Sequence, residues 1–239
     1  MKLYLLPYAG SGAMVYNQWK IEGIECVPIE YSGHGFRYQE PLLDNEADII
    51  DDIMKQIDFT EPYAIFGHSM GGLLTWLTVK CLACCRTLSL PERIFISACE
   101  PPNRLNLERY KEFSKPEAVI QYVRDYKRIS DQRINTRVFK EVLLPVIQND
   151  FHFLEKYDYK VNGAINCGGI GNVAASDVES IDIPAVVIYS GDDTLMSYEF
   201  MEEWMMFCTD IKFFEVSGDH FYIEDDKERI LEIIKGELD

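Results

Sequence analysis

The stretch that decides the fold is "AIFGHSMGGLLTWL", residues 64–77. It begins as an apolar run, which is typical of a strand buried on both faces, and it continues as a helical pattern. Between the two lies a G-x-S-x-G motif formed by Gly67, Ser69 and Gly71. In a strand–turn–helix setting the glycines let strand and helix approach closely, and the tight turn lifts the serine hydroxyl above the sheet. We therefore predict that Ser69 is a nucleophile at a helix N-terminus, where free N–H groups favour a developing oxyanion.

Strand and helix patterns alternate along most of the chain. Apolar runs predict strands at 2–7, 24–30, 62–67, 93–98, 184–190 and 211–216, and helical patterns lie at about 44–57, 71–86, 197–208 and 226–237. Because such alternation is typical of parallel sheets covered on both sides, we expect an α/β fold. Its mostly parallel central sheet should carry helices on both faces.

One segment, residues 101–180, interrupts this alternation. It contains helical patterns at 116–129 and 137–148 and no convincing strand. Long insertions in α/β enzymes often lie over the site, so we predict a helical cap inserted at about 101–180. The length of 239 residues fits a single domain, 1–239.

Charge and composition exclude several classes of partner. The net charge is −17, from 40 acidic and 23 basic residues, which argues against nucleic acid and against anionic membrane surfaces. No segment approaches the roughly 20 apolar residues of a membrane span, and the first residues lack the features of a signal peptide. The seven cysteines are an odd number, so we expect reduced thiols and a cytoplasmic protein.

Two patterns could indicate a metal or a cofactor, and we interpret both otherwise. Cys81, Cys84 and Cys85 share one face of a predicted helix, but no second pair completes a zinc set, so buried, inert thiols are expected. The G-x-G-like stretch 163–171 neither follows a clear strand nor opens a helix, which makes a dinucleotide site a poor interpretation. We therefore expect no metal and no bound cofactor.

A serine nucleophile needs a base, and the base needs an orienting acid. In this architecture they follow the serine in the order acid, then histidine. His220, in "VSGDHFYIED", lies between the last predicted strand and the last helix, where the base is expected. The acid should follow the strand before it, where Asp192 and Asp193 both qualify, and position alone does not choose between them.

The oxyanion of the reaction needs backbone N–H donors. The amide of Met70, just after the nucleophile, is the first expected donor. The second should come from the loop after the first strand, "LPYAGSG", through Ala9 or Tyr8. These roles together predict acyl transfer through a covalent acyl-enzyme.

Several motifs together give the chain a resemblance to a known family. In chain order they are "LLPYAGSGAMVYNQW", "YSGHGFRYQEP", "FGHSMGGLL", "ISACEPPN", "LPVIQNDFHFLEKY", "SGDD" and "GDHFY". The sequence resembles type II thioesterases, which are stand-alone α/β-hydrolases that accompany nonribosomal peptide and polyketide synthases. The resemblance covers nearly the whole chain and rests most on the "PYAG" loop, the "GHG" turn and the motif beginning "LPVIQND".

The resemblance implies a function and residue roles. Members of the family remove acyl groups from the phosphopantetheine arm of acyl or peptidyl carrier protein domains, so the partners are carrier proteins. The nucleophile, the base and the oxyanion amides fall on Ser69, on His220, and on Met70 with the Tyr8–Ala9 pair. The family's acid lies eleven residues before a tryptophan, and counting back from Trp204 gives Asp193.

The chain departs from the family pattern at Ser32, where proline is usual, and at Gln148, where arginine is usual. Both positions lie away from the predicted triad, near the cap, where acyl-group preference would be set. The first strand begins almost at Met1, which favours a stand-alone editing enzyme, and nothing in the sequence demands more than a monomer.

Two rival functions remain open. A carboxylesterase or lipase acting on small oxoesters would use the same triad, and a catalytically inactive hydrolase fold could serve only for binding.

Overall fold

The computed structural model describes residues 1–85, 88–105, 110–126, 129–157, 180–196 and 198–239. A six-stranded sheet forms its centre, with the strand order β2-β1-β3-β4-β5-β6 and parallel pairing throughout. The strands are β1 (Lys2–Leu6), β2 (Glu25–Pro28), β3 (Tyr63–His68), β4 (Arg93–Ser97), β5 (Ala185–Ser190) and β6 (Ile211–Val216). All six lie within two residues of their predicted bounds.

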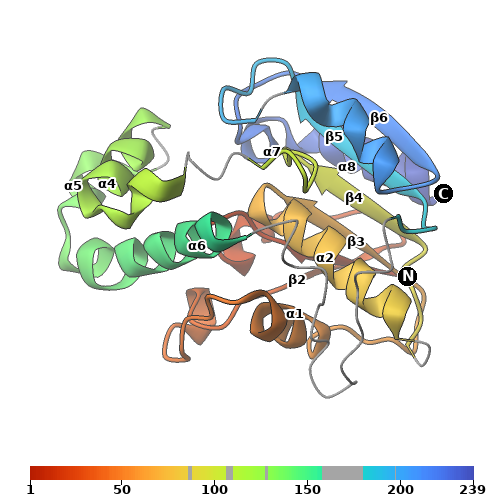
Figure 1. Cartoon of the computed structure of the whole chain (residues 1–239), viewed down its shortest axis with the longest axis horizontal. Coiled ribbons are helices and arrows are strands. Elements are labelled where there is room, and N and C mark those ends of the chain that lie inside the picture. The colour runs from red at the N-terminus through yellow and green to blue at the C-terminus, as the bar shows by residue number, and fades with distance from the viewer. Residues whose placement is uncertain (86–87, 106–109, 127–128, 158–179, 197) are drawn as a thin grey trace.

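Helices cover both faces of the sheet, as predicted. On one face lie α1 (Glu46–Met54) and α2 (Met70–Cys84), and on the other lies α8 (Lys227–Leu238) (Figure 1). Along β1 the side chains alternate, so that Tyr4 and Leu6 join the core with α1 and α2 while Leu3 and Leu5 join the core with α8. This two-sided burial explains why the inner strands, such as β1 and β3, are mostly apolar and do not alternate with polar residues.

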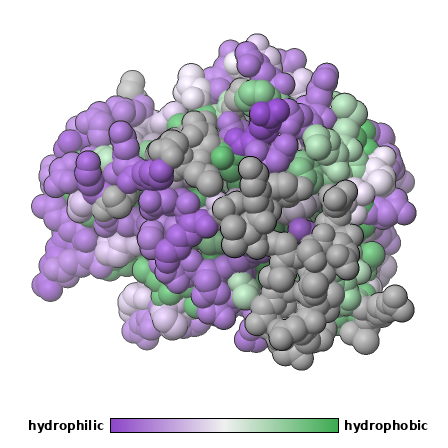
Figure 2. Space-filling view, viewed as in Figure 1, coloured by the Kyte–Doolittle hydropathy of each residue, from purple (hydrophilic) through white to green (hydrophobic). Residues whose placement is uncertain are grey.

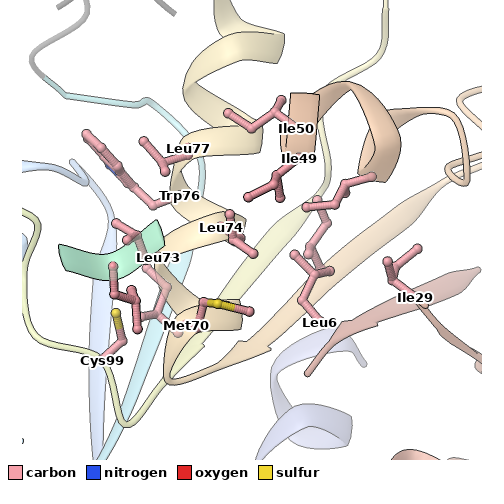
Figure 3. Close-up of a cluster of buried hydrophobic side chains, with 14 of the residues drawn as sticks. Leu6, Ile29, Ile49, Ile50, Met70, Leu73, Leu74, Trp76, Leu77 and Cys99 are labelled. Carbon is pink, nitrogen blue, oxygen red and sulfur yellow. The ribbon is translucent and has the colours of Figure 1, made fainter. Parts of the chain in front are cut away.

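The core beneath α2 is packed by side chains from several elements. Figure 3 shows Leu74 of α2 extending toward Ile49 and Ile50 of α1, with Met70 close to Leu6 at the end of β1. Ile50 and Leu74 are fully buried. The helix that begins directly after Ser69 is thus fixed on the sheet by its own apolar side chains.

Short helices fill the connections between the main elements. They are η1 (Ala13–Tyr16), η2 (Gly35–Arg37), η7 (Tyr198–Met206) and α7 (Tyr222–Asp225). The stretch predicted as a helix at 197–208 therefore contains a 3₁₀ helix over Tyr198–Met206. Its buried residues, Met201 and Trp204, are three apart, which matches three residues per turn.

Between β4 and β5 the described chain forms helices and no strand. These insertion helices are η3 (Glu112–Ser114), α4 (Pro116–Asp125), α5 (Asp131–Ile134), the π-helical turn η4 (Phe139–Leu143) and α6 (Leu144–Lys156). They lie together at one side of the sheet (Figure 1), and their visible surface in Figure 2 is mostly hydrophilic. Residues 158–179, including the glycine-rich stretch 163–171, lie outside the described residues. The division into one domain with a cap at 101–180 stays a prediction.

Most described cysteines carry free thiols, namely Cys26, Cys84, Cys85, Cys99 and Cys208. Cys81 forms a disulfide, so the expectation of reduced thiols throughout is wrong for this residue. Spacing along a helix does not reveal which cysteines meet in the folded chain. Among the described residues no helix is long and apolar enough to cross a membrane, and no three metal-ligating side chains form a cluster.

Both glycines of the G-x-S-x-G motif lie where there is no room for a side chain. A Cβ added at Gly71 would lie 2.2 Å from the carbonyl oxygen of Leu6, and one added at Gly67 would lie 2.0 Å from the carbonyl oxygen of Gly71. In both cases the obstacle is backbone, which cannot turn aside as a side chain can.

Gly71→Ala is therefore expected to lower the free energy of unfolding by about 1–3 kcal/mol or more, as overpacking does. Gly236→Ala is the matched control, because Gly236 lies in α8 with nothing within 4 Å of the added Cβ. There alanine should be neutral or stabilising by about 0.5–1 kcal/mol. Urea denaturation of both variants measures the difference, and equal stabilities would contradict this account of the turn.

Candidate active site

Ser69 stands in the turn between β3 and α2, with φ 56° and ψ −118°. A non-glycine residue with positive φ is strained, and such strain is retained where the surrounding structure imposes it. Here the imposing contacts include a hydrogen bond of 2.8 Å from the Ser69 amide to the carbonyl oxygen of Ser97 on β4. The turn has the geometry of a nucleophile elbow.

His220 follows β6, and Asp193 follows β5, so the parallel sheet brings both to the edge where Ser69 lies. The Nδ1 atom of His220 lies 2.8 Å from Oδ2 of Asp193, and both side chains are buried. A carboxylate can only accept, so Nδ1 carries the hydrogen. The lone pair of Nε2 is then available to accept a proton.

The Asp193 carboxylate is held on both oxygens. Its Oδ1 accepts hydrogen bonds from the amides of Leu195 (2.8 Å) and Met196 (3.1 Å). Burial alone would raise the pKa of Asp193, but the hydrogen bond and charge of His220, with the two amides, hold this pKa below its usual value. The group therefore stays ionised and orients the imidazole.

Asp192, the alternative acid, has a different environment. Its side chain is exposed, and its Oδ2 accepts a hydrogen bond of 3.3 Å from the amide of Gly218. It thus supports the loop that leads from β6 to His220. Of the two aspartates that the sequence left open, Asp193 is the one paired with the histidine.

Three residues that sequence reasoning missed support His220. The Nε2 atom of His68 lies 2.7 Å from the carbonyl oxygen of His220, and its Nδ1 lies 2.9 Å from Oγ of Ser97. Ser97 Oγ in turn lies 2.8 Å from the hydroxyl of Tyr222, which donates to the carbonyl oxygen of Ile188. This buried chain ties the loop carrying His220 to β3, β4 and β5.

A signal for this support was present in the sequence. His68 and Tyr222 adjoin or lie close to the predicted nucleophile and base, within "FGHSMGG" and "GDHFY". What the sequence could not show is that they meet, because 154 positions separate them along the chain.

Ser69 and His220 line one pocket together with Tyr8 and Ala9. The rest of its wall is apolar or aromatic and comes from Tyr110, Phe113, Tyr122, Phe151, Leu154, Leu195 and Met196. Phe113 stacks on Phe151 with ring centroids 4.2 Å apart, and Tyr122 meets Phe151 edge to face at 5.2 Å. The insertion helices therefore contribute an aromatic wall to the pocket that contains Ser69.

The expected oxyanion donors lie around Ser69. Met70 is the first residue of α2, so its amide is among those that have no acceptor within the helix. Tyr8 and Ala9 lie in the loop after β1, and both line the pocket beside Ser69. Both residues thus belong to the pocket that contains Ser69, and their role as oxyanion donors stays a prediction.

The remaining histidines lie elsewhere. His152 is on the outer surface of α6, 3.4 Å from Glu155, and His34 is buried 3.0 Å from Asp150. Chemically, the site offers a strained serine, an oriented imidazole and backbone donors, which are the parts needed for acyl transfer.

Comparisons with known proteins agree with this geometry. A family model described as "Thioesterase domain" matches residues 1–238. The probable anguibactin biosynthesis thioesterase AngT of Vibrio anguillarum is 24% identical, over 97% of this chain and 89% of its own length.

Two solved structures have the same fold. ClbQ from the colibactin NRPS/PKS pathway superposes with a TM-score of 0.81 at 23% identity, covering 98% of this chain and 95% of its own. YbtT, a type II thioesterase from the yersiniabactin NRPS/PKS pathway, gives 0.77 at 18% identity, over 98% of this chain and 90% of its own. The fold is therefore that of the α/β-hydrolases, as the resemblance implied, and the match over residues 1–238 shows that the chain belongs to the thioesterase family.

Proposed function

We propose that this enzyme hydrolyses acyl thioesters carried on the phosphopantetheine arm of carrier proteins of a nonribosomal peptide or polyketide synthase. The observation that supports it most is the buried His220–Asp193 pair beside Ser69, in a member of the thioesterase family. ClbQ and YbtT come by name from NRPS/PKS pathways, and AngT is by name a probable biosynthesis thioesterase, which supports a carrier-bound substrate.

In the proposed mechanism His220 Nε2 takes the proton of the Ser69 hydroxyl as Oγ attacks the thioester carbon. The amides of Met70 and of Ala9 or Tyr8 stabilise the oxyanion. The carbon–sulfur bond then breaks, and His220 returns its proton to the leaving thiolate. In the second half His220 activates water, which attacks the acyl-serine, and the free acid leaves as Ser69 regains its proton.

Asp193 keeps the hydrogen of His220 on Nδ1 and stabilises the imidazolium that forms in each half-reaction. Only side chains and amides of this chain, the thioester and a water molecule take part. The chemistry therefore requires neither a cofactor nor a second copy of the chain.

We further propose that the insertion helices act as a cap that selects the acyl group. Five pocket-lining residues belong to the described part of the predicted insertion, and four of them are aromatic: Tyr110, Phe113, Tyr122, Phe151 and Leu154. An apolar, aromatic wall favours apolar acyl chains over charged ones.

The expected result with carrier substrates is release of the acyl group at a kcat/KM at least tenfold above that for the matching p-nitrophenyl ester. Acyl-holo-carrier protein and the p-nitrophenyl ester of the same acid are compared, with mass spectrometry of the phosphopantetheine arm as the readout. Preference for the aryl ester would favour the carboxylesterase alternative. Failure to release either acyl group, with no labelling of Ser69 by a fluorophosphonate, would favour the inactive binding protein.

A further inference from the structure

Three motifs that lie far apart in the sequence meet at one carboxylate oxygen. Oδ2 of Asp150, on α6, accepts a hydrogen bond of 2.7 Å from the amide of Gly10 and lies 3.0 Å from Nε2 of His34. Gly10 belongs to the "PYAG" loop, His34 to the "GHG" turn and Asp150 to "LPVIQND". Asp150 and His34 are each only 3% exposed, so the contact is buried.

Each ring nitrogen of His34 lies within hydrogen-bond distance of an oxygen acceptor. Its Nδ1 lies 3.0 Å from the carbonyl oxygen of Ser32, which can only accept, and its Nε2 faces the Asp150 carboxylate. An imidazolium, with a hydrogen on each ring nitrogen, satisfies both contacts. Burial lowers the pKa of His34, but the charge and hydrogen bond of Asp150 outweigh it, so the pKa of His34 is raised.

Other ionisable groups surround this pair. From the chain after β2, Glu30 adds a negative charge that favours the imidazolium, and the Tyr31 ring lies 5.5 Å from that of His34. From α1, Asp52 lines the same small pocket as His34 and Asp150. Asp52 itself is paired with Arg37, at 2.7 Å.

The Gly10 amide is important because Gly10 directly follows Ala9, one of the two residues expected to supply the second oxyanion donor. Ala9 lines the pocket with Ser69, and the residues on both sides of Ala9 are fixed. Before it, the carbonyl oxygen of Pro7 accepts a hydrogen bond of 3.0 Å from the hydroxyl of Tyr31. After it, the Gly10 amide is bound by Asp150, and the backbone of Gly10, with φ +77°, lies against Ile147 of α6.

A second buried carboxylate, that of Glu30, binds the same loop a few residues further along the chain. Oε1 of Glu30 accepts from the amide of Ala13 (2.9 Å), and Oε2 accepts from the amide of Phe36 (3.1 Å). Glu30 thus joins the same loop to the turn that carries His34. The loop is fixed by Glu30 from the chain after β2 and by Asp150 from α6.

We infer that Asp150, oriented by the His34 imidazolium, is a positioning residue that holds the loop 8–10 in the geometry in which Ala9 or Tyr8 can donate to the oxyanion. This inference rests on the proposed function, because it presumes an oxyanion at Ser69. If Asp150 has this role, the catalytic geometry depends on the position of α6, because Asp150 belongs to this insertion helix and not to the sheet.

Three variants test the role of the carboxylate. Asp150→Ala removes the acceptor and is expected to lower kcat by about ten- to a hundredfold with little change in KM, as a misplaced oxyanion donor would. Asp150→Asn keeps an oxygen that can accept from Gly10 but removes the charge that stabilises protonated His34. Asp44→Asn is the matched control, because Asp44 pairs with Lys156 of α6 at 2.7 Å on the exposed surface, away from the loop.

The pH profile separates positioning from general support of the fold. Because the pKa of His34 is raised in the folded protein, its imidazolium persists above the ordinary value and is lost as pH rises through the raised value. In Asp150→Asn this pKa should fall, so kcat should decline at lower pH than in the wild type. Asp44→Asn should keep the wild-type profile.

A trifluoromethyl ketone, which needs the oxyanion site to form its adduct with serine, is the second readout. Its affinity should weaken in Asp150→Ala by about the same factor as kcat. Unchanged kcat and inhibitor affinity in Asp150→Ala, or an Asp150→Asn profile identical to the wild type, would overturn the inference. If Asp150→Ala does not fold, the Asp150→Asn profile decides alone.

Failure of the proposed function is distinguishable from failure of this inference. If the wild-type enzyme cleaves only oxoesters, the substrate proposal fails, and the same variants are then assayed on the p-nitrophenyl ester. That reaction needs the same oxyanion site. If the wild type cleaves carrier thioesters and the Asp150 variants match it, only the inference fails.

Discussion

Ser69→Ala is expected to abolish thioester hydrolysis, lowering kcat by about a millionfold, as loss of a serine nucleophile does in other triad enzymes. Alanine leaves no atom to form the acyl-enzyme, so only the pocket and the oxyanion donors can still assist direct attack by water. Release of the acyl group from an acyl-holo-carrier protein, followed by mass spectrometry, measures the loss. Labelling by a fluorophosphonate should disappear at the same time.

The control for this variant is Ser217→Ala. Ser217 is an exposed serine in the loop before His220 and should tolerate alanine with full activity. Circular dichroism and urea denaturation should show that Ser69→Ala folds like the wild type. A Ser69→Ala protein that still releases the acyl group at the wild-type rate would show that the nucleophile lies elsewhere.

Asp193→Asn is expected to lower kcat by about ten-thousandfold, through the tautomer of His220. Oδ1 of Asp193 accepts hydrogen bonds from two backbone amides, so the oxygen of the introduced amide should occupy that side. Its NH₂ group would then face Nδ1 of His220 and donate to it. This forces the hydrogen of His220 onto Nε2, where the lone pair needed to take the proton of Ser69 would otherwise lie.

Asp192→Asn is the adjacent control. Its side chain is exposed and accepts only a long hydrogen bond from Gly218 within the described residues, so kcat should change by no more than about threefold. Both variants are assayed side by side on the same acyl-carrier substrate. A greater loss in Asp192→Asn than in Asp193→Asn would contradict the assignment of the acid.

Much of the fold could be predicted from local sequence patterns. The strands β1, β3, β4 and β5 could be predicted from their composition because they are buried nearly throughout and are therefore mostly apolar. The turn at Ser69 could be predicted because only glycine fits at Gly67 and Gly71, where an added Cβ would meet backbone atoms. The 3₁₀ form of η7 could not be predicted, because its apolar spacing is compatible with an α-helix as well as with a 3₁₀ helix.

For the candidate site, too, some features could be predicted from the sequence and others could not. The residue types and chain order of Ser69, His220 and the aspartate pair were readable from the sequence alone, since each follows a strand of one parallel sheet. The choice between Asp192 and Asp193 needed either a resemblance or coordinates. Two adjacent loop residues are alike in composition and position, and only the fold decides which side chain turns inward.

Residue identity and order along the chain therefore determined the α/β architecture and pointed to Ser69 and His220 as the predicted nucleophile and base, because both inferences depend on local patterns and on the common edge of a parallel sheet. Tertiary structure alone decided what meets across the sequence. It joined His68 to the carbonyl of His220, and it brought Gly10, His34 and Asp150 to a single oxygen. The physical reason is that hydrogen bonds between distant segments depend on the packing of helices onto the sheet, and no local pattern records that packing.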